Sequence, residues 1–201
     1  MKKIVLIAGI VLFGMNVNAQ DKGKGLQGTW WVAGEISSST STTGNAKSSD
    51  NMILPIAGYF IAPSTTIGLG VGVINSKVDN GVTTTKDVAT TVIKPLIRKY
   101  WNVSGNLFFY GQAALPITMG KDNISNGKTS SFALEVAPGF DYVINKWLTV
   151  ESSFTVFNVG QTTETPQTGD KTTKFYFGAN PMNSVADRTL GSLQLGIKFL
   201  F

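Results

Sequence analysis

The chain has 201 residues, of which 42% are hydrophobic and only 14% charged, with a formal net charge of +5. Ordinary soluble domains carry about 25% charged residues, so something other than surface charge must keep this chain in solution or in its place. The weak charge and the lack of a basic run argue against nucleic acid as a partner. The absence of histidine and cysteine removes the commonest general base, the commonest transition-metal ligand and all disulfide chemistry.

The N-terminus has the pattern of a secretory signal peptide. Lys2 and Lys3 precede an apolar run from Ile4 to Met15, and Ala19 supplies a small residue before the expected cut. At 12 residues the run is short compared with the ~20 that a membrane-spanning helix needs. We therefore predict a cleaved signal peptide at 1–19, a short N-terminal segment at 20–24 and one domain at 25–201.

The rest of the chain alternates apolar and polar residues with a period of two, which predicts β-strands. No stretch of helix length shows a convincing 3.6-residue period. The predicted strands lie at 25–36, 51–62, 66–77, 87–101, 105–119, 131–144, 147–160 and 187–201.

The segments between the predicted strands alternate in length. Long polar segments such as 37–50 and 161–186 alternate with short ones such as 63–65. Outer-membrane barrels show this asymmetry, with short periplasmic turns and longer outside loops. We therefore expect long loops at one end, where an extracellular partner could bind. The aromatic stretch KFYFGANP at 174–181 is expected to extend the strands of the barrel.

A hairpin-sized unit occurs three times, beginning at Pro55, Pro95 and Pro138. Each proline is followed by a tyrosine, a short turn and a new strand. Because proline cannot donate to a strand ladder, we expect local bulges at Pro95 and Pro138. Aromatic residues near the short turns predict a girdle at a membrane–water interface, although strand propensity alone also enriches them. The predicted interface aromatics are Tyr59, Tyr100, Trp101, Tyr142 and Trp147.

Alternation gives each strand an apolar and a polar face but does not say which lies inside. A soluble barrel of the lipocalin kind would turn its apolar face inward, and a membrane barrel would turn it outward into lipid. The polar face is small and sparsely charged, which suits a packed interior better than a surface in water. Together with the alternating loops and the terminal Phe201, this favours the membrane barrel.

The polar face carries charged residues that would then lie inside the barrel. Eight strands leave an interior just wide enough for side chains. Breaking a buried ion pair costs about 3–5 kcal/mol, so we expect these charges to be paired. The predicted interior network consists of Lys94, Arg98, Glu135, Asp141, Glu151 and Lys198, with Glu35 as a further member.

In their order, these features resemble the small eight-stranded outer-membrane barrels of the OmpX type and the transmembrane domain of OmpA. The resemblance rests on the signal peptide and on GYF at 58–60, PLIRKYW at 95–101, PGFDYVINKWLTVE at 138–151 and LQLGIKFLF at 193–201. It implies an all-β, eight-stranded antiparallel up-and-down transmembrane β-barrel. It also implies a monomer in contact with lipid in the outer membrane of a diderm bacterium, reached after signal-peptide cleavage.

The resemblance also implies a role for the last strand in biogenesis. In such proteins the barrel-assembly machinery recognises a C-terminal aromatic residue preceded by hydrophobic residues at alternating positions. Here the implied assembly signal is Leu193, Leu195, Ile197, Phe199 and Phe201.

Two motifs suggest binding sites but lack the required context. GLGVGV at 68–73 has the glycines of a phosphate loop, yet no helix pattern and no Lys-Ser/Thr follow it. DNISNG at 122–127 lacks the spacing and the distal glutamate of a calcium loop. We predict no catalytic residue, no cofactor and no metal site.

The sequence leaves three functions open. The first is a non-enzymatic outer-membrane barrel with a structural or surface-interaction role. The second is a porin-like small or gated pore for ions or small solutes, which ranks lower because side chains fill an eight-stranded barrel. The third is a soluble, lipocalin-like ligand binder with its faces reversed.

Overall fold

The computed structural model describes residues 25–179 and 194–201, which form a single antiparallel sheet. The predicted signal peptide and the segment 20–24 lie outside the described residues. No helix within the described ranges is long and apolar enough to cross a membrane. The strands are β1 (Trp30–Thr43), β2 (Ala46–Ala62), β3 (Thr65–Asp79), β4 (Thr84–Ser104), β5 (Leu107–Ala114), β6 (Ile117–Asp122), β7 (Lys128–Asn145), β8 (Leu148–Ser153), β9 (Phe157–Thr165), β10 (Thr172–Gly178) and β11 (Gln194–Leu200).

These eleven segments make up eight barrel strands, because three of the strands consist of two segments each. Both β5 and β6 lie between β4 and β7, and together they form the fifth strand. Similarly, β8 and β9 pair with successive parts of β7 and form the seventh strand. The eighth strand consists of β10, which pairs with β9, and β11, which pairs with β8.

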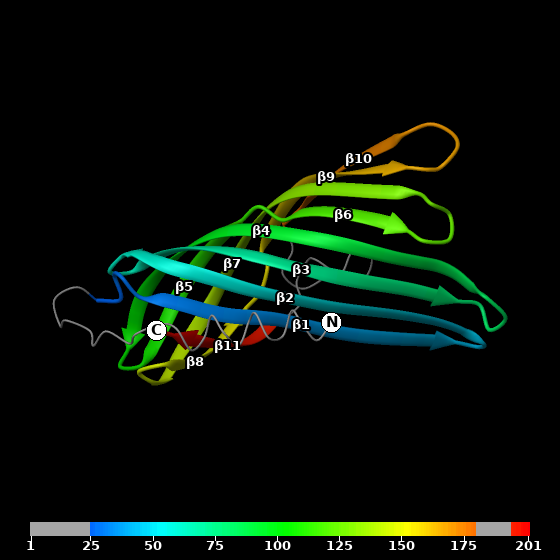
Figure 1. The fold of residues 1–201 in the computed structure, drawn as a ribbon. Helices are drawn as coiled ribbons and strands as arrows, with labels where there is room; N and C mark the ends of the chain where they lie inside the picture. Colours follow the sequence, from blue (N-terminus) through cyan, green and yellow to red (C-terminus); the bar gives the residue numbers. More distant parts are fainter. Residues whose placement is uncertain (1–24, 180–193) are drawn as a thin grey trace.

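The barrel closes where β11 pairs with β1 (Figure 1). Trp31 lies opposite Leu200, and Ala33 lies opposite Lys198. Next to them, Trp30 and Phe201 exchange two backbone hydrogen bonds of 3.1 and 2.9 Å. Because every strand also pairs with its neighbour in sequence, the predicted eight-stranded antiparallel up-and-down barrel is confirmed.

The long polar segment 37–50 is not a loop, so that part of the prediction is wrong. The pairing of β1 with β2 continues row by row to Thr43 opposite Ala46, which leaves only Gly44 and Asn45 in the turn. Gly44 takes a positive φ of 60° there, a conformation that glycine adopts without strain. The threonines favour the extended backbone, and a hairpin satisfies its own backbone hydrogen bonds in water.

The other connections at this end of the barrel are also short. They span 80–83, 123–127 and 166–171, and Figure 1 shows the four hairpins reaching the same end. We call this the distal end, and we call the end with the turns 63–64, 105–106 and 146–147 the proximal end. In the aromatic stretch 174–181, Lys174–Gly178 forms part of β10, as expected for a strand extension; residues 180–181 lie outside the described ranges.

At Pro95 the expected bulge is absent. Its ladder with β3 is continuous, and on the other side β5 ends at Ala114 while β6 begins at Ile117. The Leu115 N–H donates to the Pro95 carbonyl at 3.0 Å. The register is the same before and after this gap, so the missing proline donor interrupts the ladder without an inserted residue.

A bulge does occur opposite Pro138. Gly139 pairs with Ser153 and Val136 with Phe157, so the seventh strand has one more residue than β7 between these two rows. The Phe154 N–H donates to the Pro138 carbonyl at 3.2 Å. The extra residue changes which alternate residues point inward. The regular alternation predicted along 147–160 therefore holds only up to the bulge.

The outward face of the barrel is apolar and the inward face carries the charges. On β3, Ile67, Leu69, Val71 and Val73 are all 46–50% exposed. The glycines between them point inward, where buried charged residues from other strands also lie. This is the reverse of a soluble lipocalin-like barrel, and the structure contradicts that alternative.

Candidate functional site in the barrel interior

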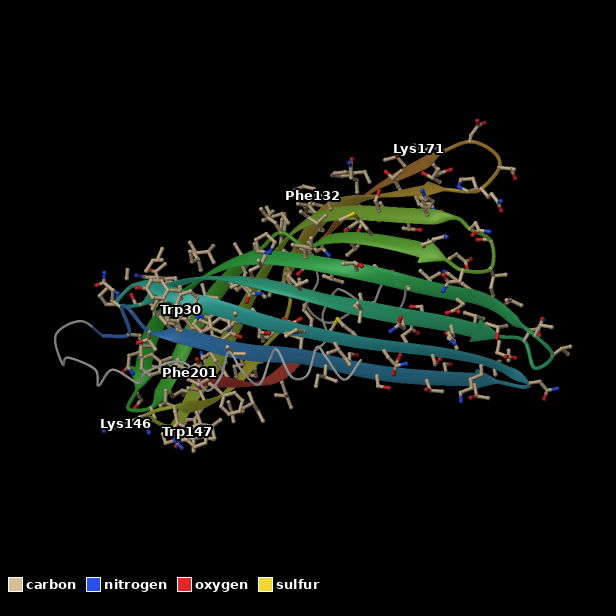
Figure 2. The ribbon with its side chains drawn as sticks, in the orientation of Figure 1. Trp30, Phe132, Lys146, Trp147, Lys171 and Phe201 are labelled. Carbon is tan, nitrogen blue, oxygen red and sulfur yellow. The ribbon has the colours of Figure 1, made fainter. Side chains whose placement is uncertain are left out.

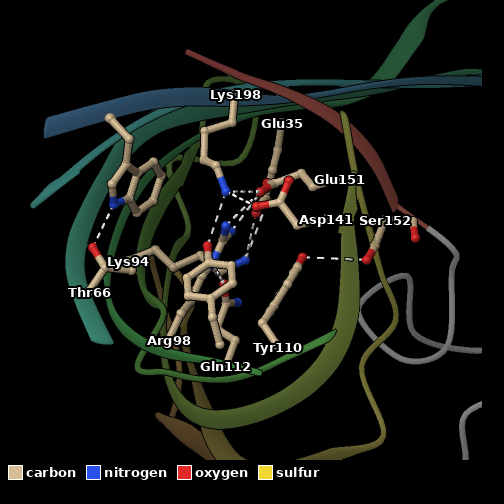
Figure 3. A network of polar contacts seen from close by, with 12 residues as sticks. Glu35, Thr66, Lys94, Arg98, Tyr110, Gln112, Asp141, Glu151, Ser152 and Lys198 are labelled. Carbon is tan, nitrogen blue, oxygen red and sulfur yellow. Dashed lines mark hydrogen bonds and ion pairs between the residues drawn. The ribbon is translucent and has the colours of Figure 1, made fainter. Parts of the chain in front are cut away.

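All six predicted network residues and Glu35 point into the barrel, where they form two ion-paired clusters. We call Arg98, Asp141, Glu151 and Lys198 the proximal cluster, and Glu35, Lys94 and Glu135 the middle cluster. Figure 3 shows most of these residues converging from β1, β4, β7, β8 and β11. The network therefore joins strands that are distant around the barrel wall.

The Arg98 guanidinium is the centre of the proximal cluster. Its Nη1 and Nη2 donate to Glu151 Oε2 and Oε1 at 2.7 and 3.3 Å, and its Nε donates to Gln112 Oε1 at 2.6 Å. A bidentate contact of this kind matches the planar fork of arginine to the carboxylate. Arg98 is thus fixed between β5 and β8 across the barrel.

Lys198 connects the two carboxylates of the proximal cluster. Its Nζ donates to Asp141 Oδ2, lies 3.8 Å from Glu151 Oε2 and donates to the Tyr100 hydroxyl at 3.2 Å. The ammonium also lies 4.9 Å from the centre of the Tyr100 ring. Two cations and two carboxylates make the cluster electrically balanced.

Aromatic rings enclose the guanidinium of Arg98. Its central carbon lies 5.0 Å from the Trp31 ring and 4.9 Å from the Tyr110 ring, within the range of cation–π contacts. The indole Nε1 of Trp31 donates to Thr66 Oγ1 at 2.6 Å, which satisfies the only polar atom of that side chain.

Glycine makes room for this tryptophan. A Cβ on Gly58 would lie 2.2 Å from Trp31 Cε2, and one on Gly68 would lie 3.0 Å from Trp31 Cζ2. The same Cβ on Gly68 would lie 3.1 Å from Leu96 Cδ1. GLGVGV at 68–73 is therefore a strip of inward glycines against packed side chains.

The middle cluster is smaller and carries an excess carboxylate. Lys94 Nζ donates to both oxygens of Glu35, at 3.1 and 3.3 Å, and lies 3.8 Å from Glu135. Lys94 and Arg98 are four residues apart on β4, so both point to the same side of the strand.

Tyr100 is not an interface residue, which corrects the prediction. It is only 5% exposed and lies inside, on the same face of β4 as Arg98. The alternation itself carried this information, because residues two apart on a strand share a face. The predicted network also did not include Trp31, Tyr110 and Gln112, which point inward with the same parity as charged or small neighbours.

The other predicted interface aromatics lie on the outer surface near the proximal end. Trp101, Tyr142 and Trp147 are about half exposed, at 49, 54 and 52%. Tyr59 is partly buried and contacts Trp30 with ring centres 4.9 Å apart. Figure 2 shows Trp30 and Trp147 near the proximal turns, together with Phe201.

Most of the implied assembly signal lies on the outward face of β11. Leu195, Ile197 and Phe199 are exposed, Phe201 is partly buried, and Leu193 lies outside the described residues. Phe199 stacks on Trp147 with an interplanar angle of 6°. The side chains that could be recognised are therefore directed away from the interior.

The described residues hold no group of three or more His, Cys, Asp or Glu side chains that could hold a metal ion. In DNISNG at 122–127 the Asp122 carboxylate accepts hydrogen bonds from the Ile124 N–H at 3.0 Å and the Ser125 hydroxyl at 2.7 Å. The Ile124 and Ser125 hydrogen bonds hold the pKa of Asp122 below its usual range. This carboxylate stabilises its own turn.

The comparisons with known proteins concern the fold. No family model and no curated protein matches the chain. Among solved structures, the outer membrane protein OprG from Pseudomonas aeruginosa is similar, with a TM-score of 0.52 and 15% identity over 90% of this chain and 99% of OprG. Neisserial surface protein A has a TM-score of 0.49 and 15% identity over 87% of this chain and 100% of that one. The chain has the fold of a small outer-membrane β-barrel.

Proposed function

We propose that the protein is an integral outer-membrane barrel with a structural or surface-interaction role and no catalytic activity. The observation that carries this proposal is the combination of an apolar outer surface with an interior blocked by the proximal cluster. The ion-paired carboxylates and the lack of histidine and cysteine support a non-enzymatic role.

The apolar outer surface has the height of a bilayer core. On β7 the outward residues from Phe132 to Tyr142 extend over ten residue steps and are mostly apolar. At about 3.3 Å per residue and a strand tilt of about 40°, this gives about 25 Å, which equals the apolar band of outer-membrane barrels.

The interior at the proximal end is occupied by side chains. Trp31, Phe60 and Tyr110 are at most 1% exposed, and Lys198 is 1% exposed. The inward glycines face packed atoms, since a Cβ on Gly70 would lie 3.3 Å from Ile56 Cγ1. These contacts support a closed barrel over a small or gated pore.

The distal hairpins support an interaction role. Beyond Ile36 opposite Ile53, the ladder of β1 with β2 continues for seven more rows to Thr43. At about 3.3 Å per residue this adds about 23 Å of strand beyond the apolar band. The added rows are rich in serine and threonine, so they form a polar surface that would face the outside of the cell.

Two experiments test the proposal. Membrane fractionation of the host should leave the protein in the outer membrane after carbonate washing, and release by salt or carbonate would contradict the proposal. Purified protein in planar bilayers should give no steady conductance. Steady ion-selective openings that Gly70→Leu abolishes would instead establish the pore.

A further inference from the structure

Two lysines face each other on the outer surface near the distal end. Lys121 on β6 lies directly opposite Lys128 on β7. Both side chains are exposed and share the outward face with Met119 and Phe132. Like charges directly opposite in a ladder destabilise it, and among the described residues no carboxylate pairs with either lysine.

The acidic groups near the pair in the ladder have other neighbours. Asp87, two residues from Ala89 on β4, lies opposite Lys77 and accepts a hydrogen bond from Asn123 Nδ2 at 3.5 Å. Asp122 is engaged by the Ile124 N–H and the Ser125 hydroxyl in its own turn. On the β4 side of the pair, Lys121 lies opposite Ala89. On the other side, Lys128 lies opposite Thr165. The two ammonium groups of the pair are therefore exposed on the outer surface of the barrel.

The lysines lie just above the apolar band. On the outward face below the pair, Met119 lies opposite Ser130, and in the next outward row Ile117 lies opposite Phe132. Ile117 and Phe132 are 36% and 48% exposed. Lys128 is four residues beyond Phe132, which corresponds to about 10 Å in height at a tilt of about 40°. The polar headgroup layer adds about 5–8 Å on each side of the hydrocarbon core, within reach of a lysine side chain.

A third lysine repeats this spacing on the next hairpin. Lys171 is exposed and precedes the outward Phe175 of β10 by four residues; Phe175 is 74% exposed. Figure 2 shows Phe132 and Lys171 on the same side of the molecule, with Lys171 nearer the turn. We call Lys121, Lys128 and Lys171 the lysine rim.

We propose that the lysine rim binds the phosphorylated headgroup of an outer-leaflet lipid whose acyl chains lie against Ile117, Phe132 and Phe175. Ammonium groups bind phosphate oxygens as point charges with three donors each. A lipid is the source of the phosphate because the exposed apolar side chains continue directly below the charges. This inference rests on the proposed membrane location and adds a ligand class and a site to it.

The test measures lipid binding by purified, folded protein in a mild detergent, with native mass spectrometry and bisphosphorylated lipid A as the probe. The K121Q/K128Q double variant should bind lipid A about 30-fold more weakly at low salt, because each lysine at an anionic surface contributes about fivefold in affinity. Each single variant should bind lipid A about fivefold more weakly. The single variants preserve the test if the double variant does not fold.

The matched control is K99Q/K146Q, which removes two exposed lysines near the proximal end. Its affinity for lipid A should be unchanged. Equal losses in both double variants, or no loss in K121Q/K128Q, would overturn the site. Displacement of lipid A by excess inorganic phosphate would show a free-phosphate site and would also overturn the lipid assignment.

Insertion is measured in parallel by heat-modifiable electrophoretic mobility and by protease protection in bilayers. If the wild-type protein does not insert, the proposed membrane function fails. If it inserts and K121Q/K128Q binds lipid A as the wild type does, only the lipid site fails.

Discussion

Asp141 and Glu151 lie directly opposite each other on β7 and β8, with both carboxylates inside the barrel. Two buried like charges in one row repel each other, so this pair requires the cations that occupy the space between them. Arg98 comes from β4 and Lys198 from β11. The carboxylate pair is therefore coupled to β11, which pairs with β8, and across the interior to β4, which pairs with neither β7 nor β8.

Replacing Glu151 by Gln should lower the free energy of unfolding by about 3–5 kcal/mol. The change leaves the buried cations Arg98 and Lys198 with one carboxylate between them. Urea unfolding of the protein in lipid bilayers, followed by tryptophan fluorescence, measures the loss.

The matched control is Lys174→Gln, which breaks the exposed pair between Lys174 and Glu164, whose side chains are 63% and 50% exposed. It should cost no more than about 1 kcal/mol. Similar losses for Glu151→Gln and Lys174→Gln would show that the interior pairs contribute no more than surface pairs.

Gly58→Ala should displace Trp31 and destabilise the barrel by about 3 kcal/mol, because the new methyl would lie 2.2 Å from the indole. The displaced ring would lose its hydrogen bond to Thr66 and its contact with Arg98. Near-UV circular dichroism and urea unfolding should both change. Gly34→Ala is the control, since a Cβ there has nothing within 4 Å; an equal effect from it would rule out the steric explanation.

Phe201→Ala should reduce the amount of protein in the outer membrane more than it reduces the stability of the folded barrel. The substitution keeps the backbone hydrogen bonds to Trp30 and removes only the aromatic side chain. Quantitative blotting of outer-membrane fractions measures the first effect, and thermal unfolding of refolded protein measures the second. Phe132→Ala removes an outward aromatic from another strand and should leave the amount unchanged. Normal levels of Phe201→Ala would contradict the addressing role.

The turn at 122–127 should stay ordered until strongly acidic pH. The pKa of Asp122 is held below its ordinary value of 3.8, mainly by the Ile124 N–H and then by the Ser125 hydroxyl. Because the folded-state pKa is depressed, the stabilising effect of the ionised carboxylate is fully present above pH 3.8. It is lost as the pH falls through the lower pKa of the folded state. Hydrogen exchange of the Ile124 amide, corrected for its intrinsic pH dependence, should show this loss. In Asp122→Ala this loss of protection at acidic pH should be absent. If it still occurs in the variant, a group other than Asp122 causes it.

Strand alternation placed the charges on one face, since Lys94 and Arg98 have the same parity on β4, and the features of a membrane barrel assigned that face to the interior. The same rule, applied fully, would have placed Tyr100 inside. The extension of β1 and β2 through 37–50 was not predictable from apolar alternation, because both faces are polar there and only the backbone ladder marks the strand. The bulge across from Pro138 was expected near the proline, but its location on the partner strand depends on tertiary pairing.

The continuous ladder of the β1–β2 hairpin also determines how its polar end can take part in recognition. Its backbone donors and acceptors are committed row by row up to Thr43 and Ala46. A partner that bound this end would meet a preorganised surface and would lose little conformational entropy from ordering it. A partner would meet hydroxyl groups such as those of Ser38 and Thr40 at a fixed spacing of two residues, because the ladder holds the backbone in place.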